Sequence, residues 1–219
     1  MINNEYLKKL ESLKVKIIDP NSVIIDETCE IGKNVVIYPG TVIKGNSIVG
    51  HNCILEGNNY IEDCVISENN KISYSYMVSS RIGKDNQIGP FSRLRNAEIL
   101  NSTKIGNFVE IKKSLVKNGV KASHLTYIGD SEIGENTNIG CGVVFCNYNG
   151  KEKFISRVGK NCFIGCNCNL IAPIEIGDNV YIAAGVTLNK NIESNKFVTN
   201  NREIKVKDDI KKIHIKKDV

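Results

Sequence analysis

A six-residue repeat of aliphatic side chains runs through most of this chain of 219 residues and constrains its fold more than any other feature. From Ile25 an aliphatic recurs every six residues up to Ile61, and the series resumes in shorter runs up to Leu188. The first two of these later runs are Ile66, Ile72 and Val78, and then Ile82, Ile88 and Leu94. Neither the helical period of 3.6 residues nor a heptad fits this spacing. Six residues make one short strand and a turn, and three such sides close a triangular coil of about 18 residues. We therefore expect an all-β parallel solenoid, with roughly nine coils between Ile25 and Leu188.

The cysteines follow the same repeat. Because side chains alternate across a strand, the residue two places before each aliphatic faces the same interior. That position holds small residues, and five of the eight cysteines are among them: Cys29, Cys53, Cys64, Cys162 and Cys168. We expect free thiols that are buried as small hydrophobic side chains. Cys-x-x-Cys spacing never occurs, so the sequence predicts no metal site.

The ends of the chain differ from the repeat. Apolar residues at helical spacing within residues 3–14 predict a short helix before Asp19-Pro20. The expected organisation is an N-terminal helical arm at residues 1–20, a β-helix domain at residues 21–200 and a basic tail at residues 201–219.

The composition excludes several classes of function. The formal net charge of +5 comes without a basic patch interleaved with aromatic residues, so a solvated surface explains it better than nucleic-acid binding. There is no apolar run near 18 residues and no apolar segment typical of a signal peptide. We expect a cytoplasmic protein that does not insert into membranes.

Stacking the coils places two cations on one outer edge. Leu94 and Ile111 lie three sides apart and so occupy successive coils, which puts Arg95 over Lys112 about one strand spacing away. Glu110 and Tyr127 form the adjacent column. Two unpaired cations this close repel each other, and a phosphate would remove that cost. A solvated polar face is the alternative.

A second column joins His124 to Cys141, Cys166 and Ala184, each of which comes two residues after an inward aliphatic. A long, thin ligand could lie along these small side chains with its reactive end near His124. The alternative for His124 is an ordinary surface imidazole.

The longest interruption of the repeat predicts a protruding loop near residues 146–157. It separates Phe145 from Val158 and carries Asn147, Tyr148 and Lys153 out of the wall, with a turn at Asn149-Gly150. Long loops on a regular scaffold often carry function, and this one could reach a neighbouring subunit.

Five motifs in order resemble the acetyltransferase domain of a bifunctional hexapeptide-repeat family, the N-acetylglucosamine-1-phosphate uridyltransferase/glucosamine-1-phosphate N-acetyltransferases. They are I-G-P-F-S-R-L-R, I-G-N-F-V-E-I-K-K, K-A-S-H-L-T-Y-I-G-D, N-I-G-C-G and C-N-Y-N-G-K-E-K-F. The resemblance covers nearly everything from Ile18 to Val198. It implies a left-handed parallel β-helix, a homotrimer with inter-subunit active sites, and acetyl transfer from acetyl-CoA to the amine of glucosamine 1-phosphate.

The resemblance also assigns roles to residues. It implies that His124 is the general base, that Glu110 supports it and that Asn147 lies near the thioester. The residues that match those holding the sugar phosphate are Arg95, Lys112, Tyr127, Asn138 and Lys153. Acetyl-CoA is expected along Cys141, Cys166 and Ala184, with Tyr148 beside Asn147. A histidine that titrates near neutral pH suits removal of a proton from the amine, and direct transfer needs no cysteine nucleophile.

The chain also departs from the family. Cys166 stands where a serine is common, and its thiol would donate a weaker hydrogen bond. Cys141 stands where a smaller residue is usual, and Arg202 is one place later than the coenzyme-facing arginine of the family. No segment matches the uridyltransferase half, so both a separate acetyltransferase and a piece of a longer enzyme fit the sequence. The alternatives are an acyltransferase for another amino sugar and a non-catalytic trimeric β-helix module.

Overall fold

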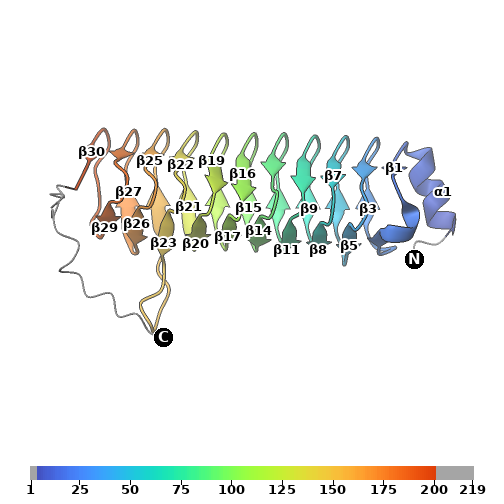
Figure 1. Ribbon diagram of the computed structural model, residues 1–219, viewed down its shortest axis with the longest axis horizontal. Coiled ribbons are helices and arrows are strands. Elements are labelled where there is room, and N and C mark those ends of the chain that lie inside the picture. The colour runs from blue at the N-terminus through green and yellow to red at the C-terminus, as the bar shows by residue number, and fades with distance from the viewer. Residues whose placement is uncertain (1–3, 201–219) are drawn as a thin grey trace, which may run out of the picture.

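The computed structural model describes residues 4–200, and their strands stack in coils along one axis (Figure 1). Each coil contributes a strand to three parallel sheets, which we call faces A, B and C. A strand pairs with the strand three places along the chain, as β14 pairs with β17 and β17 with β20, except at the end of face A, where β28 pairs with β30. The predicted all-β class and left-handed parallel β-helix of hexapeptide repeats are thereby confirmed.

The strands are short. Face A consists of β1 (Lys16–Ile17), β4 (Val36–Ile37), β7 (Ile54–Glu56), β10 (Lys71–Ser73), β13 (Gln87–Ile88), β16 (Lys104–Asn107), β19 (Lys121–His124), β22 (Asn138–Ile139), β25 (Phe163–Ile164), β28 (Tyr181–Ile182) and β30 (Phe197–Val198). Face B consists of β2 (Ile24–Ile25), β5 (Val42–Lys44), β8 (Tyr60–Glu62), β11 (Tyr76–Val78), β14 (Arg93–Arg95), β17 (Glu110–Lys112), β20 (Tyr127–Gly129), β23 (Val144–Cys146), β26 (Asn169–Ile171) and β29 (Thr187–Leu188). Face C consists of β3 (Glu30–Ile31), β6 (Ile48–Val49), β9 (Val65–Ile66), β12 (Arg81–Ile82), β15 (Glu98–Ile99), β18 (Leu115–Val116), β21 (Ser131–Ile133), β24 (Ser156–Val158) and β27 (Ile174–Ile176).

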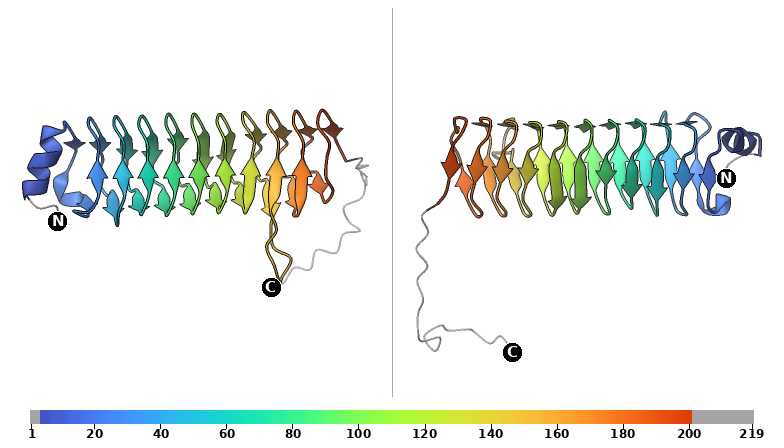
Figure 2. Two further views of the ribbon diagram at one scale, coloured as in Figure 1. Left: turned by 180° about the vertical axis from the view of Figure 1, so that it is seen from behind. Right: turned by 90° about the horizontal axis from the view of Figure 1, so that it is seen from above.

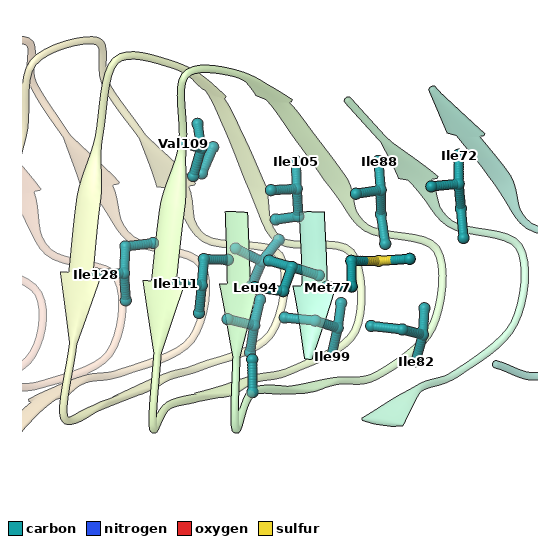
Figure 3. Close-up of a cluster of buried hydrophobic side chains, with 14 of the residues drawn as sticks. Ile72, Met77, Ile82, Ile88, Leu94, Ile99, Ile105, Val109, Ile111 and Ile128 are labelled. Atoms are coloured by element: carbon teal, nitrogen blue, oxygen red, sulfur yellow. The ribbon is translucent and has the colours of Figure 1, made fainter. Parts of the chain in front are cut away.

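The core is a single column of aliphatic side chains inside the prism. Figure 3 shows Ile72, Ile88 and Ile105 of face A, Met77, Leu94 and Ile111 of face B, and Ile82 and Ile99 of face C turned into this interior. One expected position was wrong: Met77 is fully buried, whereas Val78 lies on the outside. Successive inward residues from Ile72 through Met77 to Ile82 are five apart, so this part of the chain is shorter than the six-residue repeat assumes.

The predicted burial of five cysteines is confirmed, since Cys29, Cys53, Cys64, Cys162 and Cys168 are all buried. All eight cysteines are free. Within residues 4–200 no group of three or more His, Cys, Asp or Glu side chains could hold a metal ion.

The helix α1 (Asn4–Ser12) packs against the N-terminal end of the prism (Figure 2). Its Tyr6 and Leu10 are buried, and the Tyr6 hydroxyl donates a 2.7 Å hydrogen bond to the backbone carbonyl of Cys29. A 3-10 turn, η1 (Pro20–Ser22), follows β1. No helix of the described part of the chain is long and apolar enough to cross a membrane.

The expected organisation maps onto these elements as follows. The N-terminal arm contains both α1 and β1, and β1 already pairs with β4 of face A. The basic tail at residues 201–219, with Arg202, lies outside the described residues. Between Ile25 and Leu188, faces A and C each hold nine strands, and β1 and β30 extend face A beyond that range.

Candidate functional site

Arg95 and Glu110 form an ion pair on the outer surface of face B. Arg95 ends β14 and lies over Lys112 of β17, which is the predicted register. Its Nε donates a 3.0 Å hydrogen bond to Oε1 of Glu110, and one terminal guanidinium nitrogen contacts the same oxygen. The expectation that Arg95 is unpaired was therefore wrong. Glu110 lies diagonally across from Arg95 on the same face, and a long arginine side chain can reach a diagonal neighbour.

Lys112 and Lys153 bring two more cations to this face. Lys112 lies in β17, and Lys153 arrives from the loop after β23. The neighbouring amine of Lys153, followed by desolvation, holds the pKa of Lys112 below its ordinary value. The proximity of Lys112 raises the pKa of Lys153. The negative charge of Asp130 acts on both amines in the raising direction. Two adjacent amines on one surface favour an anionic ligand.

Asn147 lies where the hairpin leaves β23 and does not project from the wall. It is only 6% exposed, so the prediction that the loop carries Asn147 outward was wrong. Its Nδ2 donates to the Oδ2 carboxylate oxygen of Asp130 and lies 3.5 Å from the hydroxyl of Tyr127. The space for this arrangement comes from Gly129, because a Cβ there would lie 2.8 Å from Nδ2 of Asn147 and would also strike Tyr127. Gly129 follows Lys112 in the same outer column, so the missing side chain lies directly beside the lysine.

The loop after β23 is a small hairpin that protrudes from the prism, as predicted (Figure 1). Tyr148 and Lys153 form an antiparallel bridge, and the side chain of Asn149 accepts hydrogen bonds from the backbone N–H groups of the next turn. Gly150 has a positive φ of 96°, which suits the Asn-Gly turn. Tyr148 is 58% exposed and is thus available to a ligand or to another subunit.

His124 ends β19 on face A and is exposed. The strand pairs Ala122–Ile139, Ile139–Ile164 and Ile164–Ile182 place Cys141, Cys166 and Ala184 after His124 in successive coils, so the predicted column is present. Cys166 and Ala184 are exposed, and Cys141 is half-buried. These three small side chains leave an open strip that extends from the histidine toward the C-terminal coils.

Two predicted site residues are not joined to this group by hydrogen bonds within one chain. Asn138 lies on face A between Lys121 and Phe163, whereas the cations lie on face B. Among the described residues, the hydrogen bonds of the Glu110 carboxylate go to Arg95 and none reaches His124. The roles of Asn138 and Glu110 toward substrate and base stay predictions.

Asp130 was missed by the sequence reasoning. It occupies a corner with a positive φ of 47° and contacts the amide of Asn147. A signal for it was present, since Asp130 and Asn147 are 17 residues apart, the same separation as Arg95 and Lys112 in adjacent coils.

Comparisons with known proteins identify related sequences. The family described as bacterial transferase hexapeptide (six repeats) matches residues 28–63 and 156–190. The bifunctional protein GlmU of Geobacillus sp. (strain WCH70) is 43% identical over 205 residues, covering 93% of this chain and 45% of that protein. GlmU of Clostridium kluyveri (strain ATCC 8527) is 47% identical over 175 residues, covering 80% of this chain and 38% of that protein. The chain is a homologue of one part of the GlmU proteins.

The chain spans less than half the length of these curated relatives. The resemblance to the acetyltransferase domain of this bifunctional hexapeptide-repeat family, predicted from five motifs, is confirmed. Among solved structures, the UDP-N-acetylglucosamine acyltransferase from Campylobacter jejuni is similar with a TM-score of 0.45 and 18% identity, covering 81% of this chain and 68% of that chain.

Proposed function

We propose that this chain transfers the acetyl group of acetyl-CoA to the amine of glucosamine 1-phosphate, giving N-acetylglucosamine 1-phosphate. The observation that carries the proposal is the meeting of Arg95, Lys112 and Lys153 on face B, where a sugar phosphate would neutralise adjacent cations. Tyr127 and Asn138 complete the proposed phosphate-sugar set. The homology to GlmU proteins favours an amino sugar over other phosphorylated amines.

The acetyl donor belongs on the open strip beside His124. Cys141, Cys166 and Ala184 offer little steric bulk along successive coils, which suits a narrow pantetheine arm. Exposed Tyr148 of the hairpin would contact the same cosubstrate. The Cys166 thiol is a weak donor for the departing thiolate of CoA.

The chemistry removes two protons from the nitrogen and exchanges a C–S bond for a C–N bond. His124 takes a proton from the ammonium of the sugar, and the free amine attacks the thioester carbonyl. The tetrahedral intermediate then loses the second proton of the nitrogen, which passes to the departing sulfur of CoA, and the C–S bond breaks as the amide forms, so no cysteine nucleophile and no metal is required. Glu110 would support the imidazolium of His124, once a phosphate competes for Arg95. Asn147 would position the acceptor.

The organisation predicted from the sequence accompanies this proposal. Residues 21–200 would form the acetyltransferase domain, with residues 1–20 as an arm and residues 201–219 as a tail. A cytoplasmic homotrimer would place Asn138 of one subunit near the face B cations of another.

CoA release from acetyl-CoA tests the proposal with glucosamine 1-phosphate, glucosamine and other amino-sugar phosphates as acceptors. We expect turnover to be highest with glucosamine 1-phosphate. Preference for another amino sugar would favour the alternative acyltransferase, and absence of both turnover and acetyl-CoA binding would leave a trimeric β-helix module.

His124→Ala should abolish turnover while the oligomer persists by light scattering. Loss of a general base costs about 100- to 10,000-fold in rate. Unchanged turnover would remove His124 as the base.

A further inference from the structure

Asp130 ties the base of the protruding hairpin to the coil beneath it. Its Oδ2 accepts from Nδ2 of Asn147, where the hairpin leaves face B. Its backbone carbonyl accepts a 3.2 Å hydrogen bond from the N–H of Ser156, where the chain enters face C again. Its own N–H donates to the carbonyl of Lys112 at 2.9 Å. One residue thus fixes both ends of the segment that delivers Lys153.

The carboxylate also fixes the orientation of the Asn147 amide. An ionised carboxylate only accepts hydrogen bonds, so the NH₂ group of Asn147 must face Asp130. The hydroxyl of Tyr127 lies near the same nitrogen. No hydrogen bond among the described residues reaches Oδ1 of Asn147. The side chain therefore offers a ligand its carbonyl oxygen, which is an acceptor, rather than its donors.

Asp130 has an electrostatic effect as well. Its charge stabilises the protonated forms of both Lys112 and Lys153, which otherwise repel each other. The same charge opposes an incoming phosphate. Asp130 should therefore weaken simple anion binding while it keeps the amide of Asn147 in place.

We propose that Asp130 is a positioning residue of this site: it orients Asn147 so that Oδ1 accepts an N–H or O–H of the sugar that carries the phosphate. This inference rests on the proposed function for its substrate class. Asp130 itself contacts no substrate in this arrangement, and its effect passes through Asn147.

Asp130→Gly removes the carboxylate without backbone strain, because the positive φ of 47° suits glycine. We expect kcat with acetyl-CoA and glucosamine 1-phosphate to fall roughly 100-fold, the scale of a misplaced contact. KM for the sugar phosphate should not rise. Asp130→Asn retains an acceptor oxygen for the amide of Asn147 and should keep most of the kcat that Asp130→Gly loses.

Asp85→Gly is the matched control. Asp85 also has a positive φ, of 60°, and its carboxylate accepts a 3.0 Å hydrogen bond from the amide of Asn69 in the adjacent coil. It lies at a corner remote from the cations, so kcat should equal that of the wild type. A kcat for Asp130→Gly within about twofold of wild type would overturn the proposal.

A double-mutant cycle tests whether Asp130 acts through Asn147. Asp130→Gly added to Asn147→Ala should change kcat by no more than about twofold, because the group to be oriented is already gone. Fully additive losses would show that Asp130 acts elsewhere and would overturn the assignment.

Binding of inorganic phosphate, measured by calorimetry, separates this inference from the proposed function. Asp130→Gly should bind phosphate with wild-type stoichiometry and roughly threefold tighter or more, since a nearby negative charge has been removed. Weaker binding or a lost stoichiometry would mean that the site has collapsed and would overturn the proposal. This measurement tests the electrostatic effect of Asp130 on the cations even if the wild type acetylates no amino sugar.

Discussion

Replacing Arg95 by alanine tests the anion site directly. Arg95 pairs with Glu110 in the free protein, so the variant separates the contribution of this ion pair to stability from the contribution of Arg95 to phosphate binding. Its ion pair with Glu110 is only partly shielded, with side chains that are 32% and 30% exposed. Pairs of this kind contribute no more than about 1 kcal/mol, since solvent screens the charges. Arg95→Ala should therefore leave the unfolding transition almost unchanged.

The expected effect on substrate is larger. A hydrogen bond between an arginine and a charged group contributes about 1.5–3 kcal/mol when it replaces contacts with water. A phosphate must first displace Glu110, so the net loss lies near the lower end of that range. We expect KM for glucosamine 1-phosphate to rise about tenfold. The turnover number should change little, because the phosphate is bound equally in ground and transition states.

Arg157→Ala provides the matched control. Arg157 also pairs with a glutamate of the adjacent coil, at 3.1 Å from Oε1 of Glu175, but on face C instead of face B. CoA release at varied sugar phosphate gives KM, and thermal unfolding gives stability for both variants. An unchanged KM in Arg95→Ala, or an equal rise in Arg157→Ala, would refute the reasoning.

Two further predictions concern titrating groups. Burial raises the pKa of Tyr6 to about 12, so the stability that its hydroxyl provides is complete below pH 10 and is lost as the pH rises toward 12. Tyr6→Phe should lower the free energy of unfolding by about 1–2 kcal/mol at pH 7, because the Cys29 carbonyl loses its donor. In urea unfolding, the variant should lose less stability than the wild type as the pH rises above 10. Equal pH profiles for the two proteins would contradict this. The Lys153 amine lowers the pKa of Lys112. As the pH rises, the affinity for phosphate should therefore begin to fall at a pH below the ordinary pKa of lysine. Lys112→Arg keeps its charge and should bind phosphate with little pH dependence up to pH 10 by calorimetry, whereas a fall parallel to the wild type would assign the effect to another group.

The fold was predictable because one physical constraint repeats in every coil. An inward aliphatic and a small residue two places earlier are required wherever the three sheets enclose the core, so the period alone predicts the prism and the burial of Cys53 or Cys168. The error at Val78 arose where the coil shortens, and there Met77 fills the interior. Counting strictly in sixes misplaces the inward residue wherever one side of a coil has five residues instead of six.

The columns of the site were predictable for the same reason, since 17-residue spacing places Arg95 over Lys112. Side-chain pairing was not. Arg95 reaches diagonally to Glu110, and Asn147 turns inward to Asp130 although it begins a protruding loop. Such choices depend on charge and on local space, here the space left by Gly129, and the repeat carries no information about either.

The arrangement of the columns bears on how binding and chemistry can be separated. The cations and Asp130 lie on or beside face B, whereas His124 ends a strand of face A and is followed by the strip of small side chains. A substrate that bridges them would hold its phosphate on face B and its amine near His124. Changes at Arg95 should then alter KM and changes at His124 should alter kcat, because the two groups act on opposite ends of one molecule. Asp130 and Asn147 lie at the opposite border of face B from His124, one place beyond the column of Arg95, Lys112 and Gly129. A loss of kcat without a loss of phosphate affinity is the expected mark of a change at Asp130, because Asp130 acts through Asn147 and not on the phosphate.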